Sequence, residues 1–458
     1  MQILYTNFHK SPGIGGHSIY ILSLIGALAD HHDITVAVPE NSGLYRRARE
    51  IGNVYVAAQE YPNRPAAQWR AARRLRALMI ERHIKVVHVN GSADHRLVML
   101  ARMGMGSRKP AVVFTKHNDQ PISAFSAWFR ATLGTDHVIA VCDFVRRRVD
   151  ATPYRRTGVT TIANGIDTAY YDRSCVMADP EATAQVAQYR QAWTGGEGTV
   201  ALSLAPSAPS ATSTPSVPST PSTATSSAPS GHSTPSTSVP SPTSSSLASS
   251  IPLASSAPQA ASIFPSAASQ PTCDPAPSLV FFGSQAGTDD YKGWMDLVHA
   301  VASLPEPVRR RVRIALAGAW PKDFQVDEVR AAGLQDQVVF VGPLGDVRPF
   351  LAALDVGFVL SWRVETISFA CREMMSMGLP VMVSDHGGLP ENIDTGIDGW
   401  IVPRRDIAAI AQRVQQILAN PASVAQIGRA ARARALAEFG IERFVSSTEA
   451  VYRRLGGA

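Results

Sequence analysis

The chain contains few cysteines, few aromatic residues and few charged residues. Only four of its 458 residues are cysteine, 7% are aromatic and 17% are charged. The cysteines are far apart and form no Cys-x-x-Cys or Cys/His pattern; they are Cys142, Cys175, Cys273 and Cys371. This spacing argues against a disulfide framework and against a cysteine-ligated metal. We therefore expect no metal site, and a reducing compartment such as the cytoplasm.

A strong excess of charge of one sign is also absent. The formal net charge is +6 and the isoelectric point is about 9.2. This modest basic balance suits phosphates, nucleotides or an anionic membrane surface. The sequence has neither the dense basic patch nor the aromatic motif of a dedicated nucleic-acid-binding protein. Nucleic acid is therefore not an expected partner.

The sequence has no apolar run long enough to cross a membrane. The longest run, 19–29, falls well short of the ~20 residues that a membrane-spanning helix needs. Met1 leads directly into an expected strand, without the charged and apolar regions of a secretory signal. These patterns predict a cytoplasmic protein. Any membrane contact is expected to be peripheral.

A long segment in the middle of the chain has a different composition. Residues 205–278 are almost entirely Ser, Thr, Pro and Ala, and no Asp, Glu, Lys or Arg lies between Glu197 and Asp274. Such a segment buries too little apolar area to offset its ordering entropy. We predict a disordered linker whose removal leaves the fold and activity intact. A glycosylated stalk is the alternative, and it would require export.

Both flanks of this segment alternate strand-like and helix-like runs, which is typical of parallel, doubly wound sheets. The expected strands of the first half are 3–7, 34–38, 86–89, 112–115, 138–141 and 160–162, and its expected helices are 18–30, 66–83 and 144–150. The expected strands of the second half are 279–282, 312–317, 338–341, 356–360, 381–384 and 400–402, and a helix-rich tail covers 408–455. The sequence thus predicts an α/β protein with two Rossmann-like domains facing across a cleft.

The domain boundaries follow from these elements. We predict a first domain at 1–168, a connection at 169–204 and the linker at 205–278. A second domain follows at 279–435, and a C-terminal helix at 436–458 is expected to pack back toward the first domain.

The most informative stretch of the sequence runs from Glu365 to Glu391. A strand-like run precedes Glu365, and a helix is expected over 368–377, with Glu373 on it. Glu365 then lies at the carboxyl end of a strand, where open α/β sheets bind ligands. The helix N-terminus suits a diphosphate, and carboxylates accept hydrogen bonds from sugar and ribose hydroxyls. Two solvated glutamates on a helix surface are the alternative, which the following Gly-Leu-Pro-Val and Gly-Gly-Leu-Pro-Glu blocks disfavour.

Further motifs lie at the ends of expected strands. The glycines of Gly13-Ile-Gly15-Gly16-His17-Ser18 allow the backbone to approach a diphosphate or an acceptor closely. A dinucleotide fingerprint is the alternative, but its third glycine is missing. Thr115-Lys-His117-Asn118 follows another strand, and Phe281-Phe-Gly283-Ser284 precedes Lys292-Gly293. Asn164-Gly-Ile-Asp167 is typical of a tight turn.

Taken together, these motifs resemble those of glycosyltransferase family 4, a retaining family with the GT-B fold. The resemblance covers essentially the whole chain outside the linker, and it implies an N-terminal acceptor domain and a C-terminal donor domain. It implies catalytic roles for His117, Lys292 and Glu365. It implies donor or nucleotide contacts from Gly15, Gly16, Gly283, Ser284, Lys292, Ser368, Glu373, Gly387 and Gly388.

The resemblance also implies what individual side chains do. His117 would contact hydroxyls of the transferred sugar, and Glu365 would lie near the donor sugar. Lys292 would stabilise the negative charge that develops on the departing diphosphate. Glu373 would hold the nucleotide ribose, and Glu391 would act only in a supporting position.

The sequence departs from the family at one position. Ser284 stands where the family usually has an arginine, so one of two cations expected at the diphosphate is missing. Arg363 or another basic residue replaces it, Lys322 being a further candidate because it follows an expected strand. The alternative is that the arginine is not replaced and activity is reduced.

The implied reaction is a retaining, metal-independent transfer from a nucleotide-sugar, expected to be a UDP-sugar, to a hydroxyl of a glycan or lipid-linked acceptor. Lipopolysaccharide or another envelope polysaccharide is the expected product, and the resemblance implies that it is made at the cytoplasmic face of the inner membrane. No cofactor is expected beyond the donor substrate. Two groups of basic residues are candidates to dock an anionic lipid-linked acceptor: Arg70, Arg73, Arg74 and Arg76, and the run Arg146-Arg-Arg148. The alternatives are a nucleotide-sugar epimerase or a phosphorylase on the same fold, and a non-enzymatic glycan-binding protein.

Overall fold

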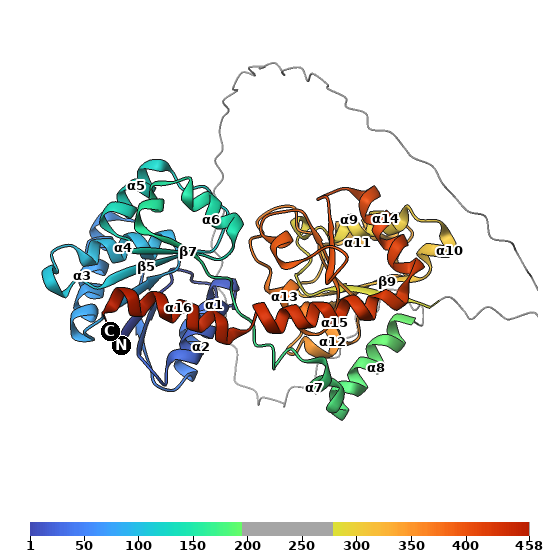
Figure 1. The fold of residues 1–458 in the computed structure, drawn as a ribbon, viewed down its shortest axis with the longest axis horizontal. Coiled ribbons are helices and arrows are strands. Elements are labelled where there is room, and N and C mark those ends of the chain that lie inside the picture. The colour runs from blue at the N-terminus through green and yellow to red at the C-terminus, as the bar shows by residue number, and fades with distance from the viewer. Residues whose placement is uncertain (195–277, 458) are drawn as a thin grey trace, which may run out of the picture. The chain divides into compact units, whose positions relative to one another are not determined.

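Figure 1 shows the computed structural model, which describes residues 1–194 and 278–457. The described residues belong to one compact unit and contain two parallel β-sheets, one in each half of the chain. The linker predicted at 205–278 lies outside the described residues, apart from its last residue. None of the described helices is both long and apolar enough to cross a membrane.

The first sheet has seven parallel strands in the order β3-β2-β1-β4-β5-β6-β7. The sequential order of the strands across the sheet reverses between β1 and β4, since β2 and β3 follow on one side of β1 and β4 to β7 on the other. Open α/β sheets bind ligands at such a switch point. The strands are β1 (Gln2–Thr6), β2 (Asp33–Val38), β3 (Val54–Ala58), β4 (Val86–Val89), β5 (Ala111–Lys116), β6 (His137–Ala140) and β7 (Val159–Thr161). The helices and short turns are α1 (Gly16–Leu28), α2 (Gly43–Glu50), α3 (Pro65–Glu81), α4 (Ser92–Arg102), η1 (Gly106–Arg108), α5 (Ala124–Leu133), α6 (Asp143–Asp150) and η2 (Pro153–Thr157).

Helices cover both faces of the first sheet (Figure 1). In β1, Leu4 packs in the cluster formed with α3, α4, α5 and α6, whereas Ile3 and Tyr5 pack in the cluster formed with α1, α2 and α16 (Ile441–Gly456). Successive residues of a strand point to opposite faces. This explains why these strands read as nearly continuous apolar runs in the sequence.

The second sheet has six parallel strands in the order β10-β9-β8-β11-β12-β13. The strands are β8 (Val280–Ser284), β9 (Val312–Ala317), β10 (Val338–Gly342), β11 (Val356–Val359), β12 (Val381–Ser384) and β13 (Gly399–Val402). The helices and short turns of this half are α7 (Arg173–Ala178), α8 (Pro180–Thr194), η3 (Asp290–Lys292), α9 (Trp294–Ala302), α10 (Glu306–Arg309), α11 (Asp323–Ala331), α12 (Arg348–Ala352), α13 (Phe369–Ser376), η4 (Leu389–Asn392), α14 (Ile407–Ala419) and α15 (Pro421–Glu438).

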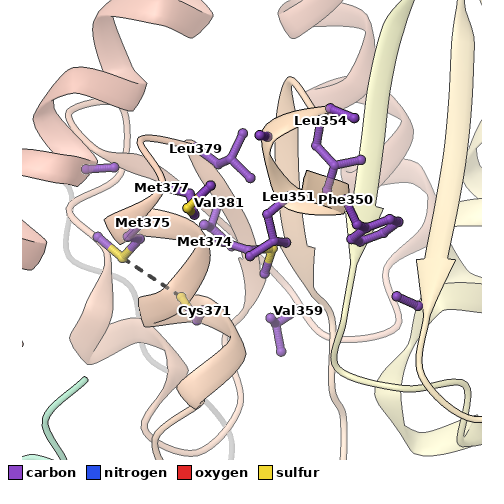
Figure 2. Packing of buried hydrophobic residues seen from close by; sticks show 14 of the residues in the cluster. Phe350, Leu351, Leu354, Val359, Cys371, Met374, Met375, Met377, Leu379 and Val381 are labelled. Carbon is purple, nitrogen blue, oxygen red and sulfur yellow. Dashed lines mark hydrogen bonds between the residues drawn. The ribbon is translucent and has the colours of Figure 1, made fainter. Parts of the chain in front are cut away.

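The second sheet is also covered on both faces. Helices α9, α11 and α14 pack on one face, and α8, α12, α13 and α15 pack on the other. Figure 2 shows part of the second cluster, in which Phe350, Leu351 and Met374 lie near the strand residues Val359 and Val381. Flexible methionine side chains fill irregular gaps in such a core. This packing fixes α13 on the sheet.

The predicted α/β fold with two Rossmann-like domains is confirmed. Every predicted strand is present, with ends that differ by at most two residues. The sequence analysis missed β3, an edge strand whose residues are mostly only partly buried. It also missed α2, α4 and α5 and, in the second half of the chain, α7 to α12. In helix α5, Ala127 is the one buried residue, and the large apolar residues, which have helical spacing, are exposed.

The C-terminal helix α16 lies against the first sheet. The Tyr452 hydroxyl shares a hydrogen bond of 2.5 Å with His88 Nδ1 and donates one of 3.1 Å to the Tyr5 hydroxyl. His32 Nε2 lies 2.7 Å from Glu449 Oε1 at the same helix. The end of the chain therefore returns to the half in which it began.

Candidate active site

Glu365 lies in the loop between β11 and α13, at the carboxyl edge of the second sheet. Its Oε2 atom lies 3.0 Å from Lys292 Nζ and accepts a hydrogen bond of 3.1 Å from the Ser361 hydroxyl. The Lys292 and Glu365 side chains are only 18% and 11% exposed. Burying two charges is costly, and such groups concentrate at functional sites. The structure thus brings two of the three predicted catalytic residues together as a mostly buried ion pair.

The loop that carries Glu365 has an unusual backbone conformation. Val364 has a φ of +52°, which costs a β-branched residue about 1–3 kcal/mol. A Cβ atom on Gly387 would lie 2.0 Å from the Glu365 carbonyl oxygen, and one on Gly388 would lie 2.0 Å from the Thr366 carbonyl oxygen. The two glycines therefore allow the turn after β12 to close against this loop. Their predicted contact with the donor sugar stays a prediction.

A similar close approach positions Lys292. This residue ends the short turn η3, and Gly293 follows it with a φ of +72° at the start of α9. A Cβ atom on Gly293 would lie 2.0 Å from the Leu360 carbonyl oxygen. Glycine is the residue that tolerates both the conformation and the contact. The Lys-Gly pair thereby holds the ammonium group beside the end of β11.

Glu373 lies on the second turn of α13, close to Gln285 and Tyr171. Gln285 Nε2 donates a hydrogen bond of 3.1 Å to Glu373 Oε2. Burial raises the pKa of Glu373, and hydrogen bonds from Gln285 and Tyr171 oppose that rise. The carboxylate is thus already arranged to accept hydrogen bonds from two donors. The sequence analysis missed Gln285 and Tyr171, because a lone polar residue after a strand or in a connection carries no pattern of its own.

Three further predicted donor residues have clear roles in the local structure. Gly283 packs closely against Leu354, since a Cβ atom at position 283 would lie 2.4 Å from the Leu354 side chain. Ser284 is buried, and its hydroxyl accepts a hydrogen bond of 3.2 Å from the Ala286 backbone N–H. Ser368 caps α13 by accepting a hydrogen bond from a backbone N–H of the first turn. Their donor contacts stay predictions.

The basic residues proposed to replace the arginine expected at position 284 lie in different environments. Arg363 is exposed in the same loop as Glu365, whereas Lys322 Nζ lies 3.8 Å from Asp290 Oδ2. A cation that the sequence analysis missed, Arg405, lies 4.9 Å from the centre of the Trp362 ring. Arg405 has a φ of +59°, which is uncommon for a residue other than glycine. Arg405 is therefore, like Arg363, a candidate to replace the arginine expected at position 284.

The third predicted catalytic residue, His117, follows β5 in the first half. Its Nε2 atom lies 2.9 Å from Asn90 Oδ1. Because Asn90 Nδ2 donates to the carbonyl oxygens of Thr6 and His88, its Oδ1 is the acceptor and His117 Nε2 carries a proton. Burial lowers the pKa of His117 far below its usual value. The imidazole is therefore neutral, with Nδ1 as an acceptor.

Histidines cluster at this edge of the first sheet. The rings of His17 and His117 stack with their centres 4.2 Å apart, and His9 Nε2 lies 3.2 Å from His17 Nδ1. Burial lowers the pKa of His17 to about 4. Within 1–194 and 278–457, no group of three or more His, Cys, Asp or Glu side chains is arranged to hold a metal ion. The cluster forms a neutral wall that can hydrogen-bond a sugar.

These histidines border a cavity of about 460 Å³. Lys116 and Arg130 also line it. Burial, with Arg130 and Arg148 nearby, lowers the pKa of Lys116 to about 8. The glycine loop of the first half lies close to the second half, since a Cβ atom on Gly16 would lie 3.9 Å from the Phe369 ring at the start of α13. Gly15 caps α1 beside it.

Hydrogen bonds connect the loops of the two halves. The Thr366 hydroxyl donates a hydrogen bond of 2.8 Å to the His117 carbonyl oxygen. The Glu391 carboxylate accepts hydrogen bonds from the backbone N–H groups of Asp143 and Phe144, at 2.8 and 2.6 Å, and so caps α6. The loops that carry His117, Lys292 and Glu365 therefore border one site. Glu391 is one of the residues that connect the two halves in this structure.

The turn predicted at Asn164-Gly-Ile-Asp167 also connects the halves. Arg372 donates a hydrogen bond to the Asn164 carbonyl oxygen. A Cβ atom on Gly165 would lie 2.7 Å from Phe444 Cβ, so glycine permits α16 to pack here. These contacts agree with the architectural role expected for the turn.

The arginines predicted to dock a lipid-linked acceptor are in different environments. Arg76 Nε donates a hydrogen bond of 2.8 Å to a carbonyl oxygen at the end of α4, so part of its guanidinium group is already engaged. Acceptor docking by the arginines of α3 stays a prediction. Arg146 pairs with Asp150 at 3.4 Å, and Arg148 donates to the Asp119 carbonyl oxygen. The arginines exposed on α3 are Arg70, Arg73 and Arg74.

The chain has two parallel β-sheets, each covered by helices, with polar residues on the loops at which the two halves meet. This architecture is that of the GT-B class. The structure is similar to a glycosyltransferase from Rickettsia africae ESF-5, with a TM-score of 0.71, 14% sequence identity, and 99% of this chain and 98% of that chain covered. It is also similar to Alr3699/HepE from Anabaena in complex with UDP, with a TM-score of 0.67, 14% identity, and 99% of this chain and 100% of that chain covered. At this identity the likeness establishes the fold.

Two family models match the sequence on either side of the undescribed segment. Glycosyltransferase Family 4 matches residues 14–170, and Glycosyl transferases group 1 matches residues 276–420. The first match includes His117, and the second includes Lys292 and Glu365. The chain belongs to the family 4 type of glycosyltransferases.

Curated relatives match parts of the chain. The amylovoran biosynthesis glycosyltransferase AmsK of Erwinia amylovora is 34% identical over 113 residues, which cover 23% of this chain and 28% of the relative. A glycogen synthase of Mycobacterium tuberculosis is 31% identical over 194 residues, covering 41% and 45%. The lipopolysaccharide core biosynthesis mannosyltransferase LpcC of Rhizobium leguminosarum bv. viciae is 32% identical over 130 residues, covering 28% and 37%. The chain spans less than half the length of these relatives.

Proposed function

We propose that this chain transfers a sugar from a nucleotide-sugar donor to a hydroxyl group of a glycan or a lipid-linked acceptor. The observation that carries the proposal is the buried Lys292–Glu365 pair at the carboxyl edge of the second sheet. Family membership supports the same class of reaction. Because relatives such as AmsK and LpcC are named for envelope glycans, we propose the synthesis of lipopolysaccharide or another envelope polysaccharide as its setting.

The donor nucleotide would bind along α13. Glu373, which now accepts a hydrogen bond from Gln285, would accept hydrogen bonds from the ribose hydroxyls. The N-terminus of α13 offers backbone N–H groups and a partial positive charge to the diphosphate. Burial raises the pKa of Glu373, so ribose binding should favour its ionised form by supplying further donors.

Lys292 would change partners when the donor binds. Its ammonium group now contacts Glu365, and a diphosphate at the N-terminus of α13 would compete for it. Cleavage of the bond between the sugar C1 and the diphosphate oxygen leaves negative charge on that oxygen, and a fixed cation lowers the barrier. Glu365 would then be free to accept a hydrogen bond from a hydroxyl of the donor sugar.

In the first half of the chain, where the acceptor would bind, the site supplies hydrogen bonds rather than a strong base. His117 is buried and neutral with its Nε2 proton held by Asn90, so Nδ1 can accept from a sugar hydroxyl. We propose that the acceptor oxygen attacks C1 on the face from which the diphosphate departs. The acceptor proton passes to the departing oxygen, and the configuration at C1 is retained. Lys292 and the amides of α13 supply the positive charge, so we propose no metal and no cofactor.

A thermal-shift panel tests the donor site. UDP-, GDP-, ADP- and dTDP-sugars would be added to the wild type and to Glu373→Ala, beginning with UDP-sugars because Alr3699/HepE was crystallised with UDP. We expect one nucleotide class to raise the melting temperature of the wild type and not that of Glu373→Ala. Glu181→Ala, at an exposed glutamate of α8, is the matched control and should respond as the wild type does. No shift with any nucleotide would refute the donor site and favour a glycan-binding protein.

Product analysis tests the reaction itself. Incubation with the donor that binds should release the nucleoside diphosphate together with a glycosylated acceptor, and the anomeric configuration read by NMR should match that of the donor. An altered nucleotide-sugar without transfer would indicate an epimerase, and a sugar phosphate would indicate a phosphorylase. Full activity in the presence of a chelator is expected.

A further inference from the structure

Helix α5 turns its large apolar side chains away from the sheet that it covers. Phe125, Trp128, Phe129 and Leu133 are all exposed, Phe125 to 76% and Trp128 to 49%. Their spacing puts them on one side of the helix, and the rings of Phe125 and Phe129 lie nearly parallel with centres 6.5 Å apart. We call these four residues the α5 apolar face. Contiguous exposed apolar side chains mark interaction sites.

The surroundings of the α5 apolar face are positively charged. No acidic residue lies between Asp119 and Asp136 in the sequence. The turn η2, which packs against α5, adds the exposed Arg155 and Arg156. Aromatic rings enter the interface of a bilayer, and flanking arginines contact its anionic headgroups. The combination is complementary to an anionic lipid surface.

The inner side of α5 borders the cavity next to His117. Ser123, Ser126 and Arg130 line this cavity, as do Lys116 and His117. One helix thus presents polar groups to the cavity and the apolar face to solvent. A bilayer against the apolar face would hold the head of a lipid-linked molecule close to the cavity.

We propose that the α5 apolar face docks on an anionic lipid bilayer and thereby presents a lipid-linked acceptor to the cavity beside His117. The inference rests on the proposed function for the identity of the acceptor. The docking itself depends on the exposed rings of α5 and on the arginines around them. It places the docking surface on α5 rather than on the arginines of α3.

Vesicle sedimentation with the full chain tests the docking. Vesicles of equal parts phosphatidylglycerol and phosphatidylcholine would be compared with vesicles of phosphatidylcholine alone. We expect binding to the anionic vesicles, weakened by salt because the headgroup contacts are screened. The double variant Trp128→Ser/Phe129→Ser should lose roughly tenfold or more in affinity, since two large apolar side chains no longer enter the interface.

Two further variants make the test decisive. Phe125→Ser changes the most exposed of the four side chains, so it should weaken binding without affecting the melting temperature. Trp69→Ser is the matched control, because Trp69 is a comparably exposed tryptophan, at 53%, on α3. Binding that is lost in Trp69→Ser and kept in the α5 variants would overturn the proposal in favour of α3. Absence of wild-type binding to either vesicle would also overturn it, and a protein partner would then be the occupant to seek.

A second measurement separates this inference from the proposed function. The thermal shift caused by the nucleotide-sugar should be unchanged in Trp128→Ser/Phe129→Ser, because these residues lie outside the donor site. Loss of vesicle binding with an intact nucleotide shift supports the docking surface. Vesicle binding through α5 in a chain that binds no nucleotide would keep the docking surface and refute the donor site.

Discussion

At the scale of single residues, Lys292 gives the most direct test of the chemistry. Lys292→Ala should lower kcat about 100-fold or more, because the departing diphosphate loses its fixed cation. Lys292→Arg should recover part of the rate, since it keeps the charge but has a different shape. Initial rates at saturating donor would measure both. Lys85→Ala, at an exposed lysine, is the control, and an equal loss of rate there would contradict a specific role for Lys292.

Gly387 tests whether the packing behind Glu365 matters. Gly387→Ala would place a Cβ atom 2.0 Å from the Glu365 carbonyl oxygen at a φ of +64°. The strain and the clash together should reduce the free energy of unfolding by about 2–5 kcal/mol, measured by urea denaturation. Gly345→Ala is the control, because a Cβ atom on exposed Gly345 meets no other atom of the described structure within 4 Å. A stability near that of the wild type for Gly387→Ala would show that the loop adapts freely.

The sequence allowed residues of the candidate site to be proposed, but not the side chains that contact them. Lys292 and Glu365 could be proposed because each follows a strand within a recognisable motif. Their direct contact could not be predicted, because it depends on how η3 and the loop before α13 pack. Gln285 and Arg405 were missed for the same reason. Their roles arise from tertiary neighbours, and neither stands in a repeated spacing.

At the scale of secondary structure, the strands were predictable because burial on both faces gives continuous apolar runs. Helix α5 shows where this reasoning fails. Its apolar residues have helical spacing, but they point away from the core. A pattern of apolar residues tells which side chains share a face, and only the fold tells whether that face is covered.

Helix α16 makes a testable contribution to the stability of the first sheet. Tyr452→Phe removes a hydroxyl that bonds both His88 and Tyr5 in a buried position. Leaving these groups without that partner should cost about 1–3 kcal/mol, measured by urea denaturation. Tyr55→Phe, at an exposed tyrosine of β3, should cost little. Equal losses in the two variants would mean that the α16 hydrogen bonds do not stabilise the sheet.

At the scale of the whole molecule, buried histidines should make folding sensitive to acid. Burial lowers the pKa of His88 and of His95 to about 3 and that of His17 to about 4. Between pH 7 and pH 5 the unfolded chain takes up protons on these residues and the folded chain does not. Stability therefore falls as the pH falls, by about 2 kcal/mol for each such histidine at pH 5.

One buried carboxyl group works in the opposite direction. Burial raises the pKa of Asp94 to about 7, so the folded chain takes up a proton there as the pH falls, and this offsets the contribution of one histidine. Urea denaturation of the wild type at pH 7, 6 and 5 should still show a net loss of stability. His95→Gln should flatten this pH dependence by about 2 kcal/mol, whatever the variant costs at pH 7. His31→Gln, at an exposed histidine, should leave the slope as in the wild type. An unchanged slope in His95→Gln would mean that His95 takes up protons equally in the folded and the unfolded chain, and that its burial does not contribute to the acid sensitivity.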